Sequence, residues 1–278
     1  MKKLSTLVLL IAVAMVFNAC KKSGGSSGGT TPPVATPKYT KKVLVEDVTG
    51  TWCGWCPLMA YALEQKAIST PNLVSVGLHD KAGTSDIYHS PYSTSIRSNF
   101  GINAFPTALV NRKSQADDSN VGSFIDANLG GKTTAGLKIE STLAANNISV
   151  KVSVGFSDNY STSSMKLVCF LVEDQLVSPQ ANYLSGNGSF AGHPYYSKPN
   201  PIPNFVHHNV LREVGNGAPL GEPIPASQTG IDAIYTNTYT INTTGYVAAN
   251  LYVVAFVLKG TECVNVQIAP AGVTKAFD

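Results

Sequence analysis

The sequence predicts an α/β domain followed by an all-β sandwich. A strand, a helix and a second strand follow one another within residues 42–78, which is typical of a parallel βαβ unit. Beyond Ala135 the apolar residues recur with a period of two, which is typical of half-buried antiparallel strands. With 278 residues, 44% of them hydrophobic, the chain is long enough for two domains of ordinary size.

Residues 1–20 have the composition of an export signal. Two lysines open the segment, an apolar run over residues 4–17 follows, and a small residue precedes Cys20. This pattern resembles a bacterial lipoprotein signal peptide, in which the cysteine becomes the lipidated first residue of the mature chain. An ordinary secretory signal and a membrane helix are the alternatives. The apolar run is short for a spanning helix, which needs about 20 residues.

Residues 21–37 are rich in Gly and Ser and then in Pro, and they predict a flexible tether with a reach of roughly 20 Å. A lipid at Cys20 would therefore attach a folded body to a membrane without fixing its orientation. The formal net charge is +3, and no basic tract with interleaved aromatic residues is present. Nucleic acid is therefore not an expected partner.

Residues 38–132 are predicted to form the α/β domain. The first strand is apolar without alternation, as in sheets that are covered on both faces. Pro57 fits the start of the first helix, where its missing N–H costs little. In chain order we expect a strand over 42–48, a helix over 57–68, a strand over 73–78, a short helix over 95–100, a strand over 108–110 and a closing helix over 119–129.

Residues 133–278 are predicted to form a β-sandwich of immunoglobulin-like type. The alternating residues 148–156 pair with residues 137–143 in a hairpin, and further strands are expected over 167–172, 235–241, 248–258 and 264–269. The segment 178–230 is too long for a structureless loop in a compact domain. We expect it to be a functional surface loop that contains a strand over 206–214.

Cys53 and Cys56 are two residues apart, between the first strand and the helix that follows. Unpaired N–H groups at a helix N-terminus stabilise a thiolate, so that a cysteine there becomes a nucleophile at neutral pH. A second cysteine at this spacing can attack the mixed disulfide that the first one forms. The pattern therefore predicts thiol–disulfide chemistry.

Residues 43–57 and 100–107 together resemble the thioredoxin fold. Trp52-Cys53-Gly54-Trp55-Cys56 differs from the thioredoxin site sequence only at Trp55, where thioredoxin has proline. Asp47 stands six residues before Cys53, and Phe105-Pro106-Thr107 matches the loop with the cis-proline. The strand and helix that normally precede the motif strand have no room after Pro37, so the domain is expected to be a trimmed version.

The resemblance implies a role for each matching residue. Cys53 corresponds to the exposed nucleophile, Cys56 to the buried resolving thiol, and Asp47 to a proton acceptor whose pKa burial raises toward neutrality. Pro106 corresponds to the cis-proline that packs on the disulfide, next to a backbone at Phe105 with which a peptide can pair. The residues expected to contact a substrate are Trp52, Trp55, Phe105 and Thr107.

Other interpretations of the cysteines and histidines stay open. The pair at 53 and 56 fits either an exchanging site or a stable disulfide of an exported protein. A zinc site needs a second close pair of ligands, so neither a metal nor another cofactor is expected. Cys169 and Cys263 could bridge or stay free. His207 and His208 are adjacent on an expected strand and therefore point to opposite faces, which makes them poor joint ligands.

The whole chain resembles the twenty-eight-kilodalton outer-membrane lipoproteins of Bacteroidetes-type bacteria. The resemblance lies in Val45–Gly50, Leu171–Gln175 and His208–Arg212. That family joins a thioredoxin-like domain to an immunoglobulin-like one, and adhesion has been a proposed theme for its role. Surface-exposed lipoproteins of such bacteria tend to have acidic residues after the lipidated cysteine. Their absence after Cys20 favours an outer-membrane anchor that faces the periplasm.

Two functional hypotheses follow. The first is a membrane-tethered protein that exchanges thiols and disulfides with protein clients, which the sandwich and its long loop select. The second is a non-catalytic outer-membrane or surface protein for binding or adhesion, which uses the thioredoxin-like domain as a scaffold. Fold alone does not separate the two hypotheses.

Overall fold

The computed structural model describes residues 35–278; the predicted signal peptide, Cys20 and most of the predicted tether lie outside the described residues. The described residues all belong to one compact unit. They are rich in strands and include three α-helices, so the prediction of an α/β chain with a large β component is confirmed. The α-helices are α1 (Cys56–Ser69), α2 (Pro91–Asn99) and α3 (Val121–Asn128).

The strands of the N-terminal half are β1 (Tyr39–Thr40), β2 (Val43–Thr49), β3 (Leu73–His79), β4 (Thr107–Val110), β5 (Ser114–Ala116) and β6 (Lys132–Thr133). Those of the C-terminal half are β7 (Ala135–Leu143), β8 (Asn147–Phe156), β9 (Met165–Glu173), β10 (Leu176–Gln180), β11 (Ile202–His207), β12 (Val210–Val214), β13 (Glu222–Pro223), β14 (Ile234–Asn242), β15 (Leu251–Lys259) and β16 (Glu262–Pro270). Single 3₁₀ turns are η1 (Gly188–Phe190), η2 (Gly215–Gly217), η3 (Ala226–Gln228) and η4 (Ala248–Asn250).

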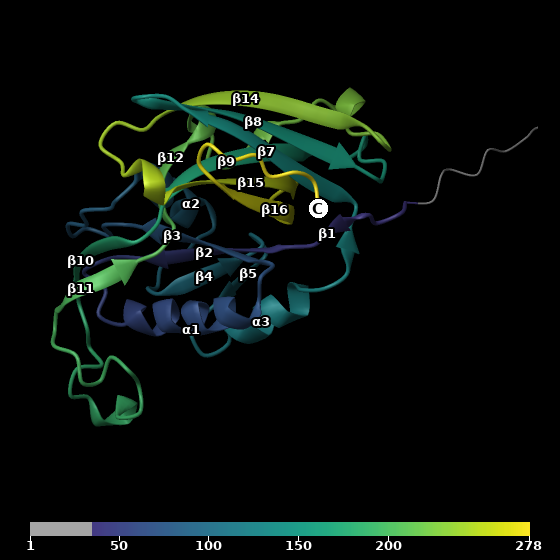
Figure 1. Ribbon diagram of the computed structural model, residues 1–278. Helices are drawn as coiled ribbons and strands as arrows, with labels where there is room; N and C mark the ends of the chain where they lie inside the picture. The colour runs from purple at the N-terminus through teal and green to yellow at the C-terminus, as the bar shows by residue number, and fades with distance from the viewer. Residues whose placement is uncertain (1–34) are drawn as a thin grey trace, which may run out of the picture. The chain divides into compact units, whose positions relative to one another are not determined.

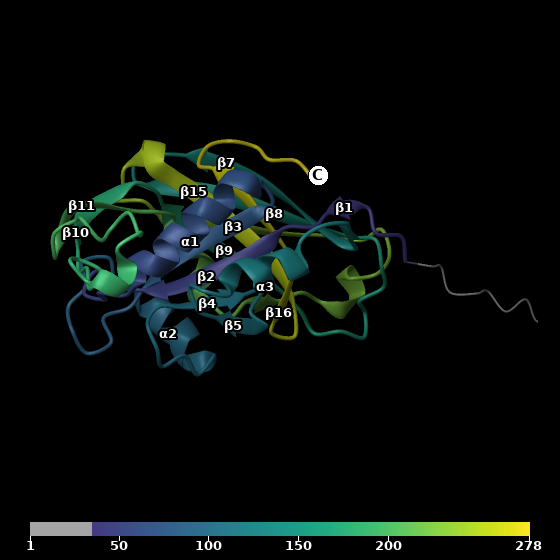
Figure 2. The same ribbon diagram turned by 90° about the horizontal axis from the view of Figure 1, so that it is seen from below.

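The strands and helices lie in four layers (Figure 1). Helices α1 and α3 cover one face of β2, β3, β4 and β5, as the view from below also shows (Figure 2). The opposite face of these strands packs on β9, β15 and β16. The separate three-stranded sheet β14-β8-β7 forms the last layer, over the other face of β9 and β15.

Strand β12 joins the two middle layers into one nine-stranded sheet, with the main order β16-β15-β9-β12-β3-β2-β4-β5. It pairs antiparallel with β9 along several residues but meets β3 through a single register pair, Val210 with Gly77. The N–H of Gly77 donates to the carbonyl of Asn209 at 3.0 Å. Both sides of the predicted domain boundary at residue 132 therefore contribute strands to the same sheet.

The alternation of apolar residues explains these layers. On β2, Val43 and Val45 face the helices and belong to the same buried cluster as Met59 of α1, whereas Leu44 faces the next layer. Strand β9 is buried on both faces, because its odd-numbered apolar residues face β7, β8 and β14 and its even-numbered ones face β3. Such strands are apolar without interruption, which is what the sequence shows at 167–172.

Two predicted strands differ from the structure. The strand expected over 206–214 is two strands, β11 and β12, because Asn209 has a φ of +47° and breaks the extended chain between them. The strand expected from residue 248 begins at Leu251, after the turn η4. Among residues 35–278, no helix combines the length and hydrophobicity that crossing a bilayer requires.

Candidate functional site

The cysteine pair lies in the turn that connects β2 to α1. Cys56 is the first residue of α1, and Cys53 lies in the turn before it. The helix therefore begins about one turn after Cys53, whereas the sequence predicts Cys53 at the helix start. The two sulfurs form a disulfide, with 5.4 Å between the Cα atoms. The N–H of Cys53 donates to the carbonyl of Gly50 at 3.0 Å, and that of Cys56 donates to the carbonyl of Cys53 at 3.2 Å. These bonds hold the turn in place.

Asp47 of β2 lies behind this pair. Its side chain is buried, and its Oδ1 atom has no hydrogen-bond partner among the described residues. Burial raises the pKa of Asp47 to about 7. The sequence-based expectation of a buried carboxyl that titrates near neutrality agrees with this value, and such a group can accept or return one proton at physiological pH.

The loop before β4 reaches the same site. The Phe105–Pro106 peptide bond is cis, and Thr107 pairs with Val48, next to Asp47, across β2 and β4. The Trp52 ring meets the Phe105 ring edge-on, with 5.0 Å between centroids. Its Nε1 donates to the carbonyl of Asp80 at 2.8 Å. The structure thus brings Trp52, Phe105 and Thr107 together, as the motifs predict.

Cys53 is not the exposed residue that the sequence predicts. Only 4% of its surface is accessible, and 1% of that of Cys56. A segment that begins at the last residue of β10 contacts the motif turn, and we call these residues, Gln180–Leu184, the cover segment. Gln180 donates from Nε2 to the carbonyl of Cys53 at 2.8 Å. Sequence spacing alone cannot detect a contact across 127 residues.

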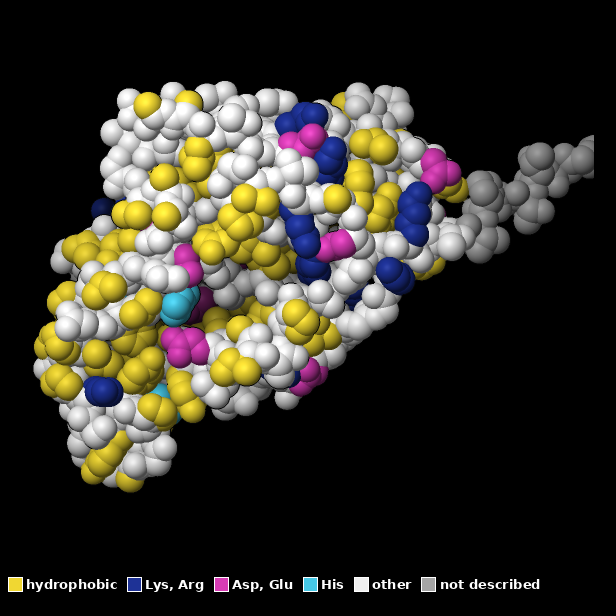
Figure 3. Space-filling model, in the orientation of Figure 1, with side chains coloured by type: hydrophobic (Ala, Val, Ile, Leu, Met, Phe, Trp, Pro, Cys, Tyr) yellow, Lys and Arg dark blue, Asp and Glu magenta, His cyan; other side chains and the backbone are white. Residues whose placement is uncertain are grey.

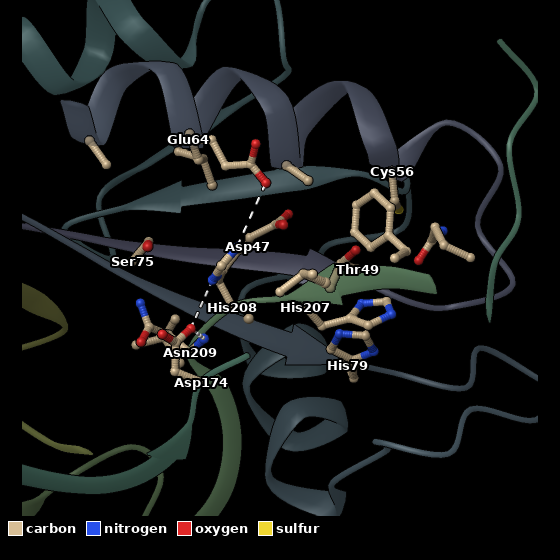
Figure 4. A pocket seen from close by; sticks show the side chains of 18 of the residues that line it. Asp47, Thr49, Cys56, Glu64, Ser75, His79, Asp174, His207, His208 and Asn209 are labelled. Atoms are coloured by element: carbon tan, nitrogen blue, oxygen red, sulfur yellow. Dashed lines mark hydrogen bonds and ion pairs between the residues drawn. The ribbon is translucent and has the colours of Figure 1, made fainter. Parts of the chain in front are cut away.

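A cavity of about 400 Å³ lies between α1 and the strands β2, β3 and β11, and His208 and Asn209, which follow β11, also line it. Asp47 and Cys56 line its inner part, and Figure 4 shows Asp47 between Glu64 above and His208 below. His208 binds Asp174 through Nδ1 at 2.8 Å, and its Nε2 lies 3.9 Å from Glu64. On the surface, the hollow is bordered by histidine and acidic side chains (Figure 3).

These rim residues have shifted pKa values. The hydrogen bond to Asp174 raises the pKa of His208, and burial raises the pKa of Glu64. For Asp174, burial acts to raise the pKa, but the bonds with His208 and the Asn209 and Gln175 N–H groups outweigh it and lower the pKa. The cavity therefore leads from the buried carboxyl to a charged rim that can exchange protons with solvent.

His207 points away from this rim, into a cluster with His79 and Tyr88. Its ring lies 5.1 Å from that of His79 and 5.2 Å from that of Tyr88, and Nε2 bonds Ser178 Oγ at 2.9 Å. Burial, followed by the neighbouring His79, lowers the pKa of His207 to about 3. The two adjacent histidines thus have separate surroundings, as predicted for neighbours on a strand.

Asp86 connects the histidine cluster to the motif turn. It accepts hydrogen bonds from the Thr51 N–H at 2.6 Å and the Tyr88 N–H at 2.8 Å, and its Oδ2 lies 3.1 Å from His79 Nδ1. Burial acts to raise the pKa of Asp86, but these bonds outweigh it and the pKa falls to about 2. The carboxylate is therefore ionised at neutral pH and positions the turn.

A family model described as Outer membrane protein Omp28 matches residues 93–275. This chain belongs to the Omp28 family. The family predicted from the sequence is therefore confirmed, and membership indicates an outer-membrane or envelope location. The matched range begins after the cysteine pair, so membership in the Omp28 family does not bear on redox chemistry.

The Omp28-family chain is also similar in structure to solved proteins. HBP35 of Porphyromonas gingivalis superposes with a TM-score of 0.65 at 16% identity, over 85% of this chain and 77% of that one. A protein from Agrobacterium tumefaciens superposes with a TM-score of 0.50 at 13% identity, over 87% of this chain and 99% of that one. At such identities these likenesses concern the fold alone. No curated protein matches the chain.

The other two cysteines within residues 35–278 of this Omp28-family chain, Cys169 and Cys263, are free thiols in different layers. Cys169 faces the three-stranded sheet and Cys263 faces the opposite side of the main sheet, so they do not bridge. Burial raises the pKa of both thiols, which makes them unreactive. Within residues 35–278, no group of three or more His, Cys, Asp or Glu side chains is arranged to hold a metal ion.

Proposed function

We propose that this protein is a lipid-anchored envelope protein that exchanges thiols and disulfides with protein clients. One observation supports this proposal most: a disulfide next to a helix start is backed by a buried carboxyl, Asp47, whose pKa is about 7. A buried carboxyl without a hydrogen-bond partner costs folding free energy. A role in proton transfer at the neighbouring cysteine would explain why the chain has a carboxyl at this destabilising position.

We further propose that residues 38–132 form a trimmed thioredoxin-like unit and residues 133–278 an immunoglobulin-like sandwich. The parallel pair β2–β3 connected by α1, followed by the antiparallel β4 after a cis-proline, supports the first assignment. The packing of β7, β8 and β14 on β9 and β15 supports the second. The long segment 178–230 supplies the end of β10, the strands β11 to β13 and the cover segment.

In the reduced protein, the Cys53 thiolate would attack one sulfur of a client disulfide. The client S–S bond breaks, and the other client sulfur leaves as a thiolate that takes a proton from solvent. Cys56 then gives its proton to Asp47, its thiolate attacks Cys53, and the mixed disulfide breaks. The second client sulfur leaves as a thiolate and takes up a proton from solvent, while Asp47 returns its own proton to solvent. The client gains two electrons and two protons, and the disulfide seen between Cys53 and Cys56 forms. The reverse sequence would oxidise a client.

The anchor belongs to the same proposal. Lipid at Cys20 and the tether over 21–37 would hold the folded body at the outer membrane, facing the periplasm, where protein clients with disulfides or thiols are available. No metal or other cofactor is required, because both electrons pass between sulfur atoms.

The test is turnover on a protein disulfide, such as insulin, with a dithiol as the electron source. The wild-type chain should accelerate reduction, Cys53→Ser should abolish the acceleration, and the control Cys169→Ala, which removes a buried free thiol, should retain it. Cys56→Ser should trap mixed disulfides with envelope proteins. Absence of turnover, with a Cys53–Cys56 bond that resists mild reductant, would reject the exchange function.

The burial of both sulfurs favours a second candidate function. With 4% of Cys53 accessible, the pair could serve as a structural disulfide in a binding or adhesion protein. In that case Cys53→Ser would lower the free energy of unfolding but leave ligand or surface binding of the folded chain unchanged. The same variant therefore separates the two functions.

A further inference from the structure

The cover segment lies along the motif turn as a short strip that runs in the same chain direction as the turn. The N–H of Ala181 donates to the carbonyl of Thr51 at 2.8 Å, and the N–H of Tyr183 donates to the carbonyl of Gly54 at 2.9 Å. Nε2 of Gln180 donates to the carbonyl of Gly50 at 3.2 Å as well as to that of Cys53. In Figure 1 the chain between β10 and β11 descends beside the end of α1 at which this turn lies.

The ring of Tyr183 rests directly on Gly54. A Cβ atom on Gly54 would overlap this ring, whereas the φ angle of Gly54 is not positive. Glycine is therefore required here by the close approach of the ring and not by the backbone conformation. Trp55 meets the Tyr183 ring edge-on at 5.5 Å and lies 5.7 Å from Phe190. Both central residues of the motif therefore contact the segment 180–190.

The cover segment is itself held in place. The Asn182 side chain is 1% exposed, and its Nδ2 donates to the carbonyls of Tyr195, Lys198 and Pro199. The Leu184 side chain is fully buried. In contrast, Tyr183 is 51% exposed, because one side of its ring faces solvent. Tyr183 thus lies at the surface as a lid over the turn, between two buried anchor residues.

We propose that Gln180 and Tyr183 determine which thiols and disulfides reach Cys53. This inference rests on the proposed exchange function. The cover segment occupies the surface through which a client chain must approach, and its N–H groups already use the carbonyls of Thr51 and Gly54 with which such a chain could pair. A compact reagent needs only a small displacement of Tyr183, whereas a folded protein must move the whole strip.

The reaction that measures access is reduction of the Cys53–Cys56 disulfide by an external dithiol. A reagent thiolate attacks Cys53, the bond to Cys56 breaks, and Cys56 leaves as a thiolate that is then protonated. The second thiol of the reagent attacks the mixed disulfide and releases Cys53. Two electrons and two protons pass to the protein, and the reagent becomes a disulfide. This reaction takes place whether or not the protein turns over clients.

The experiment compares dithiothreitol, a small dithiol, with reduced thioredoxin, a folded protein dithiol, on the oxidised full chain. Tyr183→Ala should raise the rate with the protein dithiol by about tenfold, the factor that corresponds to one lost aromatic contact, and the rate with dithiothreitol by less. Gln180→Ala should act in the same direction. Tyr196→Ala is the matched control, because Tyr196 lies in the same loop but its ring is not one of the two that pack on Trp55 of the motif.

Hydrogen exchange gives a second readout without redox chemistry. The Ala181 and Tyr183 amides of the oxidised protein should exchange faster in Tyr183→Ala, while the Leu171 amide in β9 stays protected. The inference is overturned if folded Tyr183→Ala and Gln180→Ala leave the ratio of the two reduction rates unchanged. Failure of the exchange function would give a different result. The wild type would not turn over insulin, but the two variants would still shift the ratio of the reduction rates.

Discussion

Arg112 and Glu46 form a two-point ion pair that is shielded from solvent. Nε of Arg112 donates to Oε2 at 2.8 Å and Nη2 donates to Oε1 at 2.6 Å, while Nη1 donates to the carbonyl of Pro219 at 2.9 Å. The guanidinium also lies 4.8 Å from the centre of the Phe256 ring. The pair therefore connects β2, next to the cysteine motif, with the layer of β15.

Removing one partner of this pair should destabilise the whole described unit. Arg112→Met leaves the Glu46 carboxylate buried without a partner, so we expect the free energy of unfolding to fall by about 3–5 kcal/mol. The double variant Arg112→Met with Glu46→Leu should lose clearly less, because no unpaired charge remains. Urea denaturation of Arg112→Met, Glu46→Leu and the double variant measures the coupling, and a double-variant loss equal to the sum of the two single losses would contradict it.

Asp47→Asn should change how stability depends on pH. The pKa of Asp47 rises from 3.8 to about 7 on folding, so between these values the folded chain holds a proton that the unfolded chain has lost. The stabilisation is complete below the unfolded pKa and is lost as pH rises through about 7. At pH 8 the variant should therefore be more stable than the wild type, by at most about 4 kcal/mol.

Denaturation from pH 4 to pH 8 measures this difference. Asp126→Asn is the control, because Asp126 is an exposed carboxylate at the end of α3, paired with Lys66 on the surface. Its variant should parallel the wild-type pH profile across this range. An Asp47→Asn profile that also parallels the wild type would mean that Asp47 does not retain its proton on folding.

The same substitution should slow release of the mixed disulfide. If Asp47 accepts the proton of Cys56, Asp47→Asn should lower the rate of this step by about a hundredfold at pH 7. The wild-type rate should fall as pH drops below about 7, where the carboxyl becomes protonated, and the variant should lack that dependence. Stopped-flow measurement of a mixed disulfide at Cys53 tests both statements.

The sequence predicted the parts of this site that lie close together in the chain. The strand, the turn and the helix around Cys53 follow from local apolar patterns, and the motifs supplied Asp47 and the loop at Pro106. The cover segment could not be found in this way, because Gln180 is 127 residues from Cys53 and its neighbours show only a turn-rich composition. Cys53 is buried because of this contact, whose two partners lie far apart in the sequence.

The pairing of strands was also beyond the sequence pattern. Alternation predicted that β8 is half-buried and pairs with β7, but a period of two does not specify the partners of the remaining strands. The link between β12 and β3 depends on Gly77, where a Cβ atom would lie 3.2 Å from the carbonyl oxygen of His208. This close approach allows strands from the two predicted domains to pair in one sheet.

Cys169 and Cys263 should resist alkylation in the folded protein. Both thiols are buried in apolar layers, and burial raises their pKa values, so little thiolate forms at neutral pH. Iodoacetamide at pH 8 should modify neither residue until denaturant is added, after which mass spectrometry of peptides should find both modified. Protection that vanishes well before global unfolding would contradict the placement of these thiols in the core.

His207 should make the fold sensitive to acid. Its pKa falls from 6.5 to about 3 on folding, so between these values the unfolded chain binds a proton that the folded chain does not, and stability falls as pH falls. Between pH 7 and pH 4.5 the wild type should lose about 2.5 kcal/mol that His207→Gln does not lose. At pH 7 the variant should be the less stable protein, because its side chain gives up the ring contacts with His79, Tyr88 and Phe205.

Denaturation at both pH values measures how the difference in the free energy of unfolding between wild type and His207→Gln changes. His89→Gln is the control, because His89 has its own hydrogen bond to Thr94 outside the cluster. If the difference in the free energy of unfolding between wild type and His207→Gln stays constant over this range, His207 does not take up a proton on unfolding.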